Sequence, residues 1–360
     1  MTVESPKLAA ARAGLEAARA AVANGPGPDA QALRTAYLDL LKLTLCDLAG
    51  SSTTSVGRTP DGQVMAREMD GDQLRLRSAG MDWPLHGLTM VGLGRLDDLQ
   101  RCVEAVVRDG VAGDLIEAGS WRGGASILMR AALDTLGESA RTVWVADSFQ
   151  GFPRVADAER EDDELDVFDF LAVSLGEVKD NFARFGLEDG VSFVPGFFEE
   201  TMPALSGRRW AIARLDGDSY EATWLTLQTL YPGLSTGGYL IVDDFGALDE
   251  CRQAVEEFRE QHGIEEPLEQ VDWTGVRWRK DREVEIGDRP DRQDNARTAA
   301  PEPVKRPERA HVPTMAELDL ERELADVRQR LAAAEAELKR LRRSPLRAAK
   351  ARLRNKLSRR

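Results

Sequence analysis

Two patterns of apolar and polar positions alternate along this chain, one with the spacing of a helix and one with that of a buried strand. Apolar residues at three- and four-residue spacing predict amphipathic helices, and short apolar runs between them predict buried strands. From residue 114 onward strands and helices alternate, which is typical of a parallel sheet with helices packed on it. The expected helices cover 30–49, 95–110, 125–136, 175–185, 220–231 and 249–262. The expected strands cover 114–117, 143–146, 191–194, 210–215 and 238–242, with a closing antiparallel strand at 275–279.

Segments without either period separate these elements and set the domain boundaries. We expect a flexible leader over 1–29, one α/β domain over 30–285, and a disordered linker over 286–313, which is rich in Pro, Arg, Asp and Glu. Ser, Thr and Gly over 50–62 predict a loop. An acidic run over 154–170 follows the second strand of the alternating region, at the edge where such sheets bind ligands. It is either a solvated insertion or a lid.

The C-terminal segment has a period of its own. Apolar residues lie four and three apart within 314–343, which predicts a short coiled coil and therefore a homo-oligomer. A solitary charged helix is the alternative. Eleven Lys and Arg residues and no Asp or Glu occupy 339–360, so the tail over 344–360 is basic. Its expected partner is an anionic membrane surface or the acidic body of this protein; a solvated tail without a partner is the third reading.

Composition narrows the class of protein further. The whole chain carries a formal net charge of −14 despite its basic tail, and an acidic body argues against nucleic acid as the main partner. Three widely spaced cysteines form no metal-binding pattern and indicate a reducing compartment. No apolar run is long enough to cross a membrane. We expect a cytoplasmic protein, with the basic tail as the feature that would bring it to the inner membrane face.

The residues after the first strand of the alternating region predict a site for a nucleoside cofactor. Gly119, Gly123 and Gly124 lie between this strand and a helix, where glycine permits close backbone approach to a ligand. The second strand ends at Asp147, and a carboxylate there suits a ribose diol. Glu117 takes the first glycine position of a dinucleotide fingerprint, where it would repel a pyrophosphate and attract an ammonium group. S-adenosylmethionine (SAM) therefore fits better than NAD; a tight structural turn without a ligand is the alternative.

Acidic residues end two later strands. Asp216 follows one of them, and Asp243 and Asp244 follow the next. If the strands are parallel neighbours, the three carboxylates converge beside the nucleoside site and repel one another unless they are protonated or bind a cation. Oxygen ligands without His or Cys favour a hard ion, Mg²⁺ above all. Asp218 is either an N-terminal cap of the following helix or a catalytic residue.

Several segments together resemble the macrocin O-methyltransferase family over roughly residues 30–280. The resemblance implies a Rossmann-like class I methyltransferase fold, in which a mostly parallel sheet is flanked by helices. It also implies methylation of a sugar hydroxyl with SAM and a divalent metal. Residues 46–58 and the C-terminal extension depart from the family pattern. The matching stretches are Asp82-Trp-Pro, Thr89-Met-Val-Gly-Leu, Arg95-Leu-Asp-Asp-Leu, Gly113-Asp-Leu-Ile-Glu, Trp121-Arg-Gly-Gly, Val143-Trp-Val-Ala-Asp-Ser-Phe-Gln-Gly, Leu215-Asp-Gly-Asp-Ser-Tyr-Glu and Val242-Asp-Asp-Phe.

The resemblance also implies roles for individual residues. The turn over 117–124 would hold the methionine end of SAM, Asp147 would bind the ribose, and 196–198 would lie near the adenine. Asp216, Asp243 and Asp244 would ligate the metal. The whole cofactor set implied in this way is Thr89, Met90, Glu117, Gly119, Ser120, Arg122, Gly123, Asp147, Ser148, Gly196 and Phe197.

The expected reaction is attack of a sugar hydroxyl on the SAM methyl group. A metal lowers the pKa of such a hydroxyl, and Asp216 would accept the proton. The acceptor would be a glycosylated small molecule or a glycan. Two alternatives remain: a catechol-type O-methyltransferase, which needs the same carboxylates, and a non-catalytic scaffold assembled through the coiled coil. Intact Glu117, Asp147 and metal carboxylates argue against the scaffold.

Overall fold

The computed structural model describes residues 28–50, 53–58, 64–69, 73–152 and 169–287. The described residues fall into two compact units, of which the smaller is confined to the range Val56–Ala66. The larger unit holds all the elements that position the candidate site. The leader, linker, coiled coil and basic tail expected from the sequence lie outside the described residues, as does most of the acidic run.

A seven-stranded sheet forms the centre of the larger unit, with the strand order β6-β5-β4-β7-β8-β10-β9. The pairs between β6 and β8 are all parallel, and β10 runs antiparallel to both β8 and β9. Because the chain starts at β4 and moves outward first to one side and then to the other, the order reverses between β4 and β7. The strands are β4 (Asp114–Ala118), β5 (Val143–Asp147), β6 (Val191–Pro195), β7 (Trp210–Leu215), β8 (Leu234–Val242), β9 (Glu269–Gln270) and β10 (Val276–Arg279).

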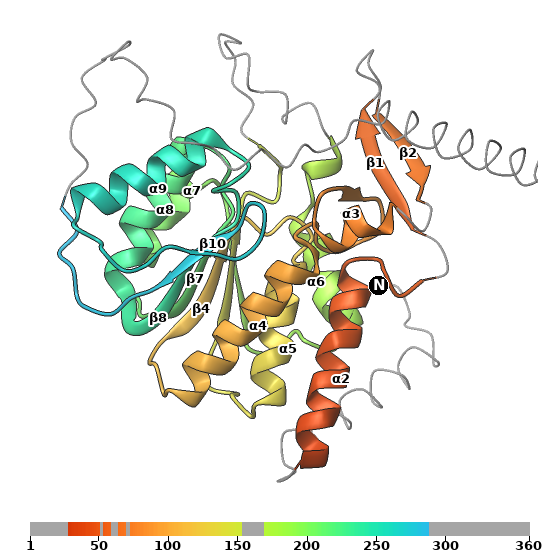
Figure 1. Cartoon of the computed structure of the whole chain (residues 1–360), viewed down its shortest axis with the longest axis horizontal. Coiled ribbons are helices and arrows are strands. Elements are labelled where there is room, and N and C mark those ends of the chain that lie inside the picture. The colour runs from red at the N-terminus through yellow and green to blue at the C-terminus, as the bar shows by residue number, and fades with distance from the viewer. Residues whose placement is uncertain (1–27, 51–52, 59–63, 70–72, 153–168, 288–360) are drawn as a thin grey trace, which may run out of the picture. The chain divides into compact units, whose positions relative to one another are not determined.

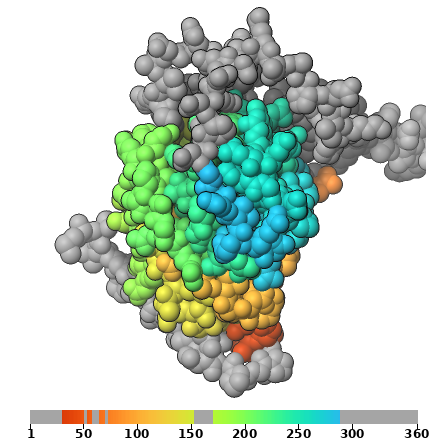
Figure 2. All heavy atoms as spheres, turned by 90° about the vertical axis from the view of Figure 1, so that its left-hand side faces the viewer, coloured from red at the N-terminus to blue at the C-terminus, as the bar shows by residue number. Residues whose placement is uncertain are grey.

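Helices cover both faces of this sheet and give it two hydrophobic cores (Figure 1). Successive strand residues point to opposite faces, so Leu115 joins one core and Ile116 the other. One face is covered by α2 (Pro28–Leu45), α4 (Gly92–Arg108), α5 (Gly124–Thr135) and α6 (Leu175–Arg184). The other is covered by α8 (Tyr220–Leu230) and α9 (Asp249–Gln261), with the short α7 (Phe198–Thr201) beside them. Figure 2 views the molecule from the α8 and α9 side, where the last described residues appear in blue.

The sequence predicted this architecture correctly, with element boundaries displaced by a few residues. All five parallel strands and the antiparallel strand that ends at Arg279 are confirmed, and so are the six helices. The helix expected over 30–49 ends at Leu45, and Asp47, two residues later, takes a left-handed φ of 57°. All three cysteines are free and buried, as a reducing setting allows. In the part of the chain that the structure describes, no helix is long and apolar enough to span a membrane.

The prediction of a loop over 50–62 is wrong, because this segment contains the strand β1 (Thr54–Arg58). The backbone carbonyl of Thr54 accepts a hydrogen bond from Leu85 N at 2.8 Å, and Ser55 and Val56 are buried. Pairing and burial stabilise β structure here in spite of a composition rich in Ser, Thr and Gly. A small sheet with the order β2-β1-β3 results, with β2 at Val64–Glu68 and β3 at Trp83–Pro84; α3 (Leu74–Ser78) lies between β2 and β3 in sequence.

Candidate active site

Backbone strain gathers at the carboxyl ends of the central strands. Trp121, Phe149 and Asp218 follow β4, β5 and β7, and all three adopt left-handed φ values, of 47°, 54° and 59°. Such values are uncommon for residues other than glycine, and they persist where the surrounding structure imposes them. The strained residues therefore lie along one edge of the sheet, where ligands bind in folds of this topology.

The glycine turn after β4 lies tightly against the end of β7. Gly119 has a φ of 89°, and a Cβ atom there would lie only 1.9 Å from the backbone oxygen of Asp216. Gly123, with a φ of 84°, precedes the first turn of α5. Gly124 donates its N–H to Leu88 O at 2.9 Å, so segment 88–90, which includes the predicted Thr89 and Met90, lies beside the turn. Glycine is required here because only glycine fits the approach.

Asp147, at the end of β5, organises the same turn. Its Oδ2 accepts hydrogen bonds from the backbone N–H of Ser120 at 2.7 Å and of Trp121 at 3.2 Å. Its Oδ1 accepts from Phe149 N at 2.8 Å. The carboxylate is thus fixed at the edge of the sheet, and ribose binding by it stays a prediction. Next to it, Ser148 Oγ donates to Gly151 O at 2.7 Å.

The remaining predicted cofactor residues border this edge. Arg122 uses its guanidinium to hold the chain before Thr89, since Nη1 donates to Leu85 O at 2.8 Å and to Gly87 O at 2.9 Å. Gly196 follows β6 and donates its N–H to Asp147 O at 3.0 Å. Phe197 comes next and precedes α7. The structure therefore brings all of the predicted cofactor residues to one edge.

Glu117 is deeply buried, and both of its carboxylate oxygens have partners inside the protein. Its side chain is 2% exposed; Oε1 accepts from Arg214 Nη1 at 2.6 Å, and Oε2 accepts from the Ser126 hydroxyl. Burial raises the pKa of Glu117 to about 7, although Arg214 and Ser126 lower it. Direct contact with a cofactor ammonium, as predicted from the sequence, would have to replace one of these bonds, and it stays a prediction.

Three carboxylates meet at the ends of β7 and β8. Asp216, Asp218 and Asp244 each place an oxygen within 4.8 Å of the others. Burial, Asp218 and Asp216 raise the pKa of Asp244 well above its usual range, and one of its buried oxygens, Oδ2, has no hydrogen-bond partner. Burial and the neighbouring charge of Asp216 raise the pKa of Asp218 to about 7. Asp216 has Arg214 as a partner at 2.8 Å, so the three carboxylates bring together more negative charge than this one guanidinium supplies.

The N-cap role predicted as one alternative for Asp218 is wrong. The N-cap of α8 is Ser219, whose hydroxyl accepts a hydrogen bond from Ala222 N at 3.2 Å. A hydroxyl at the N-cap satisfies one of the free N–H groups of a first turn. The side chain of Asp218, one residue earlier, lies instead beside Asp216 and Asp244.

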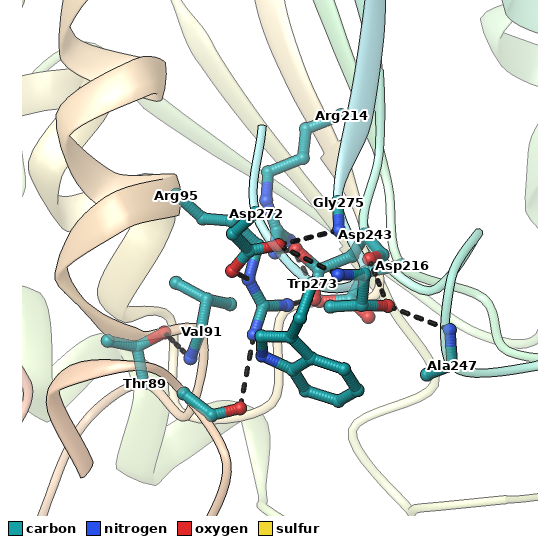
Figure 3. A network of polar contacts seen from close by, with 12 residues as sticks. Thr89, Val91, Arg95, Arg214, Asp216, Asp243, Ala247, Asp272, Trp273 and Gly275 are labelled. Carbon is teal, nitrogen blue, oxygen red and sulfur yellow. Dashed lines mark hydrogen bonds and ion pairs between the residues drawn. The ribbon is translucent and has the colours of Figure 1, made fainter. Parts of the chain in front are cut away.

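Asp243 is held differently from its neighbour Asp244. Its Oδ1 accepts from Arg214 Nη2, and its Oδ2 accepts from Arg95 Nη1, so each oxygen has its own guanidinium (Figure 3). Burial raises the pKa of Asp243, against the two arginines. The three-carboxylate cluster therefore contains Asp218 where the sequence placed Asp243, and ligation of a metal by Asp243 stays a prediction.

Sequence reasoning missed the arginines that surround these acids. Arg95, on α4, also donates from Nε to Asp272 Oδ2 at 3.0 Å, and Trp273 lies 5.9 Å from its guanidinium carbon (Figure 3). Arg214 lies inside β7. A charged residue in the middle of the apolar run Trp210–Leu215 was the available signal, because a buried arginine needs acidic partners.

We expect that Asp147→Ala weakens binding of the product S-adenosylhomocysteine by about 1–3 kcal/mol, the range for losing hydrogen bonds to a charged group. The variant also removes the acceptor that holds Ser120 N and Trp121 N. Titration calorimetry measures the change, with Asp189→Asn, at an exposed position before β6, as the matched control. An affinity equal to that of the unmodified protein would show that Asp147 does not touch the cofactor.

Comparison with known proteins agrees with this geometry. The family model described as Macrocin-O-methyltransferase (TylF) matches residues 34–280. The 8-demethyl-8-(2,3-dimethoxy-α-L-rhamnosyl)-tetracenomycin-C 4′-O-methyltransferase of Streptomyces olivaceus is 48% identical over 251 residues, covering 68% of this chain and 93% of the relative. The mycinamicin III 3″-O-methyltransferase of Micromonospora griseorubida is 43% identical over 251 residues, covering 68% and 96%.

A solved structure supports the same assignment. The structure of the O-methyltransferase NovP is 40% identical in sequence, with a TM-score of 0.61, and covers 69% of this chain and 100% of its own. The family match spans most of the domain that carries the glycine turn and the carboxylates. This chain belongs to the macrocin O-methyltransferase family and is a SAM-dependent O-methyltransferase.

Proposed function

We propose that this protein methylates a hydroxyl of a sugar, in a glycosylated natural product or a surface glycan, with the help of a divalent metal. The observation that carries the metal is the cluster of Asp216, Asp218 and Asp244 beside the glycine turn. The relatives named above as methyltransferases of tetracenomycin and mycinamicin glycosides support the sugar acceptor.

The residues present fit a hard cation such as Mg²⁺. The cluster offers only carboxylate oxygens, which hard divalent cations prefer over sulfur and imidazole ligands. Oδ2 of Asp244 is buried without a hydrogen-bond partner, and a buried polar atom without one is costly. Asp216 and Asp244 would hold the ion, with Asp218 or Asp243 as the third ligand. Bound there, the cation would lower the pKa of a sugar hydroxyl.

The residues of the chain then have three tasks. The glycine turn and segment 88–90 hold SAM, the carboxylate cluster orients the acceptor, and an aspartate accepts the hydroxyl proton. The sequence favours Asp216 as this base. The geometry favours Asp218, because Oδ2 of Asp216 already accepts a bond from Arg214 at 2.8 Å.

An acceptor screen tests the sugar assignment. The full-length protein is incubated with Mg²⁺ and methyl-labelled SAM, against rhamnosylated aromatic and macrolide glycosides in one arm and simple catechols in the other. Mass spectrometry should find the label on a sugar hydroxyl. Transfer to catechols, with none to any glycoside, would refute the sugar acceptor and favour the catechol-type alternative.

The C-terminal extension is proposed to assemble the enzyme and to bring it to an anionic surface. The support is the sequence alone: heptad spacing within 314–343, and eleven basic residues without an acid over 339–360. Full-length protein should sediment with anionic liposomes at low salt, whereas a 1–290 truncation should not. Equal sedimentation of both forms, or none of either, would contradict the membrane proposal.

A further inference from the structure

One buried arginine holds three carboxylates that come from three adjacent strands. Arg214 is 3% exposed and lies in β7 between β4 and β8. Nη1 donates to Glu117 Oε1 at 2.6 Å and to Asp216 Oδ2 at 2.8 Å, and Nη2 donates to Asp243 Oδ1. An arginine side chain does not lose its proton in proteins, so this guanidinium is permanently charged.

The register of the sheet explains this convergence. Glu117 and Arg214 are directly paired across the parallel strands β4 and β7. Asp216 directly follows β7, two residues after Arg214, which places its side chain on the same side as that of Arg214. Leu215 pairs with Val242 of β8, which places Asp243 next to Asp216. The rigid sheet thus fixes the backbone of all four residues.

Glu117 offers the cofactor no exposed, unpartnered oxygen. It is 2% exposed in its side chain, and its second oxygen accepts from the Ser126 hydroxyl. Its charge faces the arginine and, beyond it, the aspartates at the ends of β7 and β8. Glu117, although it begins the cofactor turn, therefore points toward the aspartates that follow β7 and β8.

We propose that Glu117 is a positioning residue for the metal carboxylates, acting through Arg214, and not a contact of the cofactor. The inference rests on the metal site proposed above. Glu117 draws the guanidinium toward β4 and takes a share of its positive charge. Arg214 then orients Asp216 and Asp243 without neutralising them fully, which leaves negative charge for a divalent cation.

A second arginine, Arg95, holds the other oxygen of Asp243. Arg95 holds Oδ2 of Asp243 and donates from Nε to Asp272 Oδ2 at 3.0 Å. Asp272 in turn accepts backbone N–H groups of Thr274 at 3.0 Å and of Gly275 at 2.7 Å. Asp243 is therefore held between two guanidiniums, and the carboxylate that Glu117 influences through Arg214 has a single fixed orientation (Figure 3).

The test measures two equilibria that need no turnover. Mn²⁺ binding is followed by electron paramagnetic resonance, and binding of S-adenosylhomocysteine to the metal-free protein is followed by calorimetry. In Glu117→Gln, which keeps the shape and removes the charge, Mn²⁺ affinity should fall about 10- to 100-fold, as for other residues that orient ligands. Affinity for S-adenosylhomocysteine should stay within about threefold.

The double variant decides whether Glu117 acts through Arg214. Arg214→Lys keeps the charge but cannot bridge three carboxylates, so it should also weaken Mn²⁺ binding. In that background Glu117→Gln should add less than about threefold, because both changes break one linkage. Arg130→Lys is the matched control: Arg130 is also buried and paired with an aspartate, Asp134, but it bonds Arg141 O, before the start of β5. This control should leave both affinities unchanged.

The outcomes separate this inference from the proposed function. A tenfold loss of S-adenosylhomocysteine affinity in Glu117→Gln, with Mn²⁺ affinity unchanged, would overturn the inference and restore Glu117 as a cofactor contact. Fully additive losses of Mn²⁺ affinity would also overturn it. If Glu117→Gln does not fold, Arg214→Lys alone provides the test: an unchanged Mn²⁺ affinity in that variant would also overturn the inference. Unmodified protein that binds S-adenosylhomocysteine but no Mn²⁺ would refute the proposed metal site itself, and the inference with it.

Discussion

Asp216→Asn should reduce kcat/KM by about a thousandfold or more while the protein still binds S-adenosylhomocysteine. Asp216 belongs to the three-carboxylate cluster and accepts a hydrogen bond from Arg214 at 2.8 Å. An amide is a weaker cation ligand than a carboxylate and cannot accept a proton, so the change removes a proposed metal ligand and also the base that the sequence favours. Initial rates of methyl transfer and calorimetry of S-adenosylhomocysteine binding provide the two measurements.

The control for this variant is Asp189→Asn. Asp189 is exposed and precedes β6, so it lies at the opposite edge of the sheet from the carboxylate cluster. The same chemical change there should leave kcat/KM unaltered. An Asp216→Asn enzyme with full activity would remove Asp216 from the site, and a variant that lost cofactor affinity as well would assign it to SAM binding.

Gly119→Ala should destabilise the fold by roughly 3 kcal/mol or more, and the folded fraction should bind S-adenosylhomocysteine poorly. The new Cβ would lie 1.9 Å from Asp216 O, which is backbone directly after β7 and cannot move aside cheaply. Relief of this clash has to separate the ends of β4 and β7, between which the site is built. Denaturant unfolding and calorimetry measure the two effects.

Gly110→Ala is the matched control for the backbone strain. Gly110 has a φ of 64°, but a Cβ there would meet nothing within 4 Å. It should cost only the left-handed strain, about 1 kcal/mol. If Gly119→Ala were no more destabilising than Gly110→Ala, the close approach of the turn to β7 would be wrong.

The sheet could be predicted from the sequence because its strands are short, apolar and separated by amphipathic helices. Residues such as Leu115 and Ile116 are buried on both faces, which leaves a continuous apolar run as the signal. The strand β1 around Thr54 has no such signal in the sequence. Its strand depends on pairing with a segment near Leu85, some thirty residues away, and composition does not report such pairing.

The candidate site was predictable in its location and only partly in its contacts. Strand ends placed Asp216, Asp243 and Asp244 on one edge, but adjacent residues at a strand end point to opposite sides. Asp243 turns to Arg95 and Arg214, and Asp244 turns to the cluster. Arg95 is 148 residues from Asp243, so no local pattern connects them. Asp218 joins the cluster through a left-handed φ of 59°, which is uncommon outside glycine and which the sequence does not report.

Metal-dependent methyl transfer to a sugar is the central claim, and one titration tests it most directly. The enzyme is stripped with a chelator, and incorporation of labelled methyl from SAM into an accepted glycoside is measured as Mg²⁺ is added. We expect no incorporation without metal and a saturable recovery with Mg²⁺, because Asp216, Asp218 and Asp244 bring three carboxylates together and Asp244 Oδ2 has no hydrogen-bond partner. Full incorporation by the stripped enzyme, indifferent to Mg²⁺, would contradict the account.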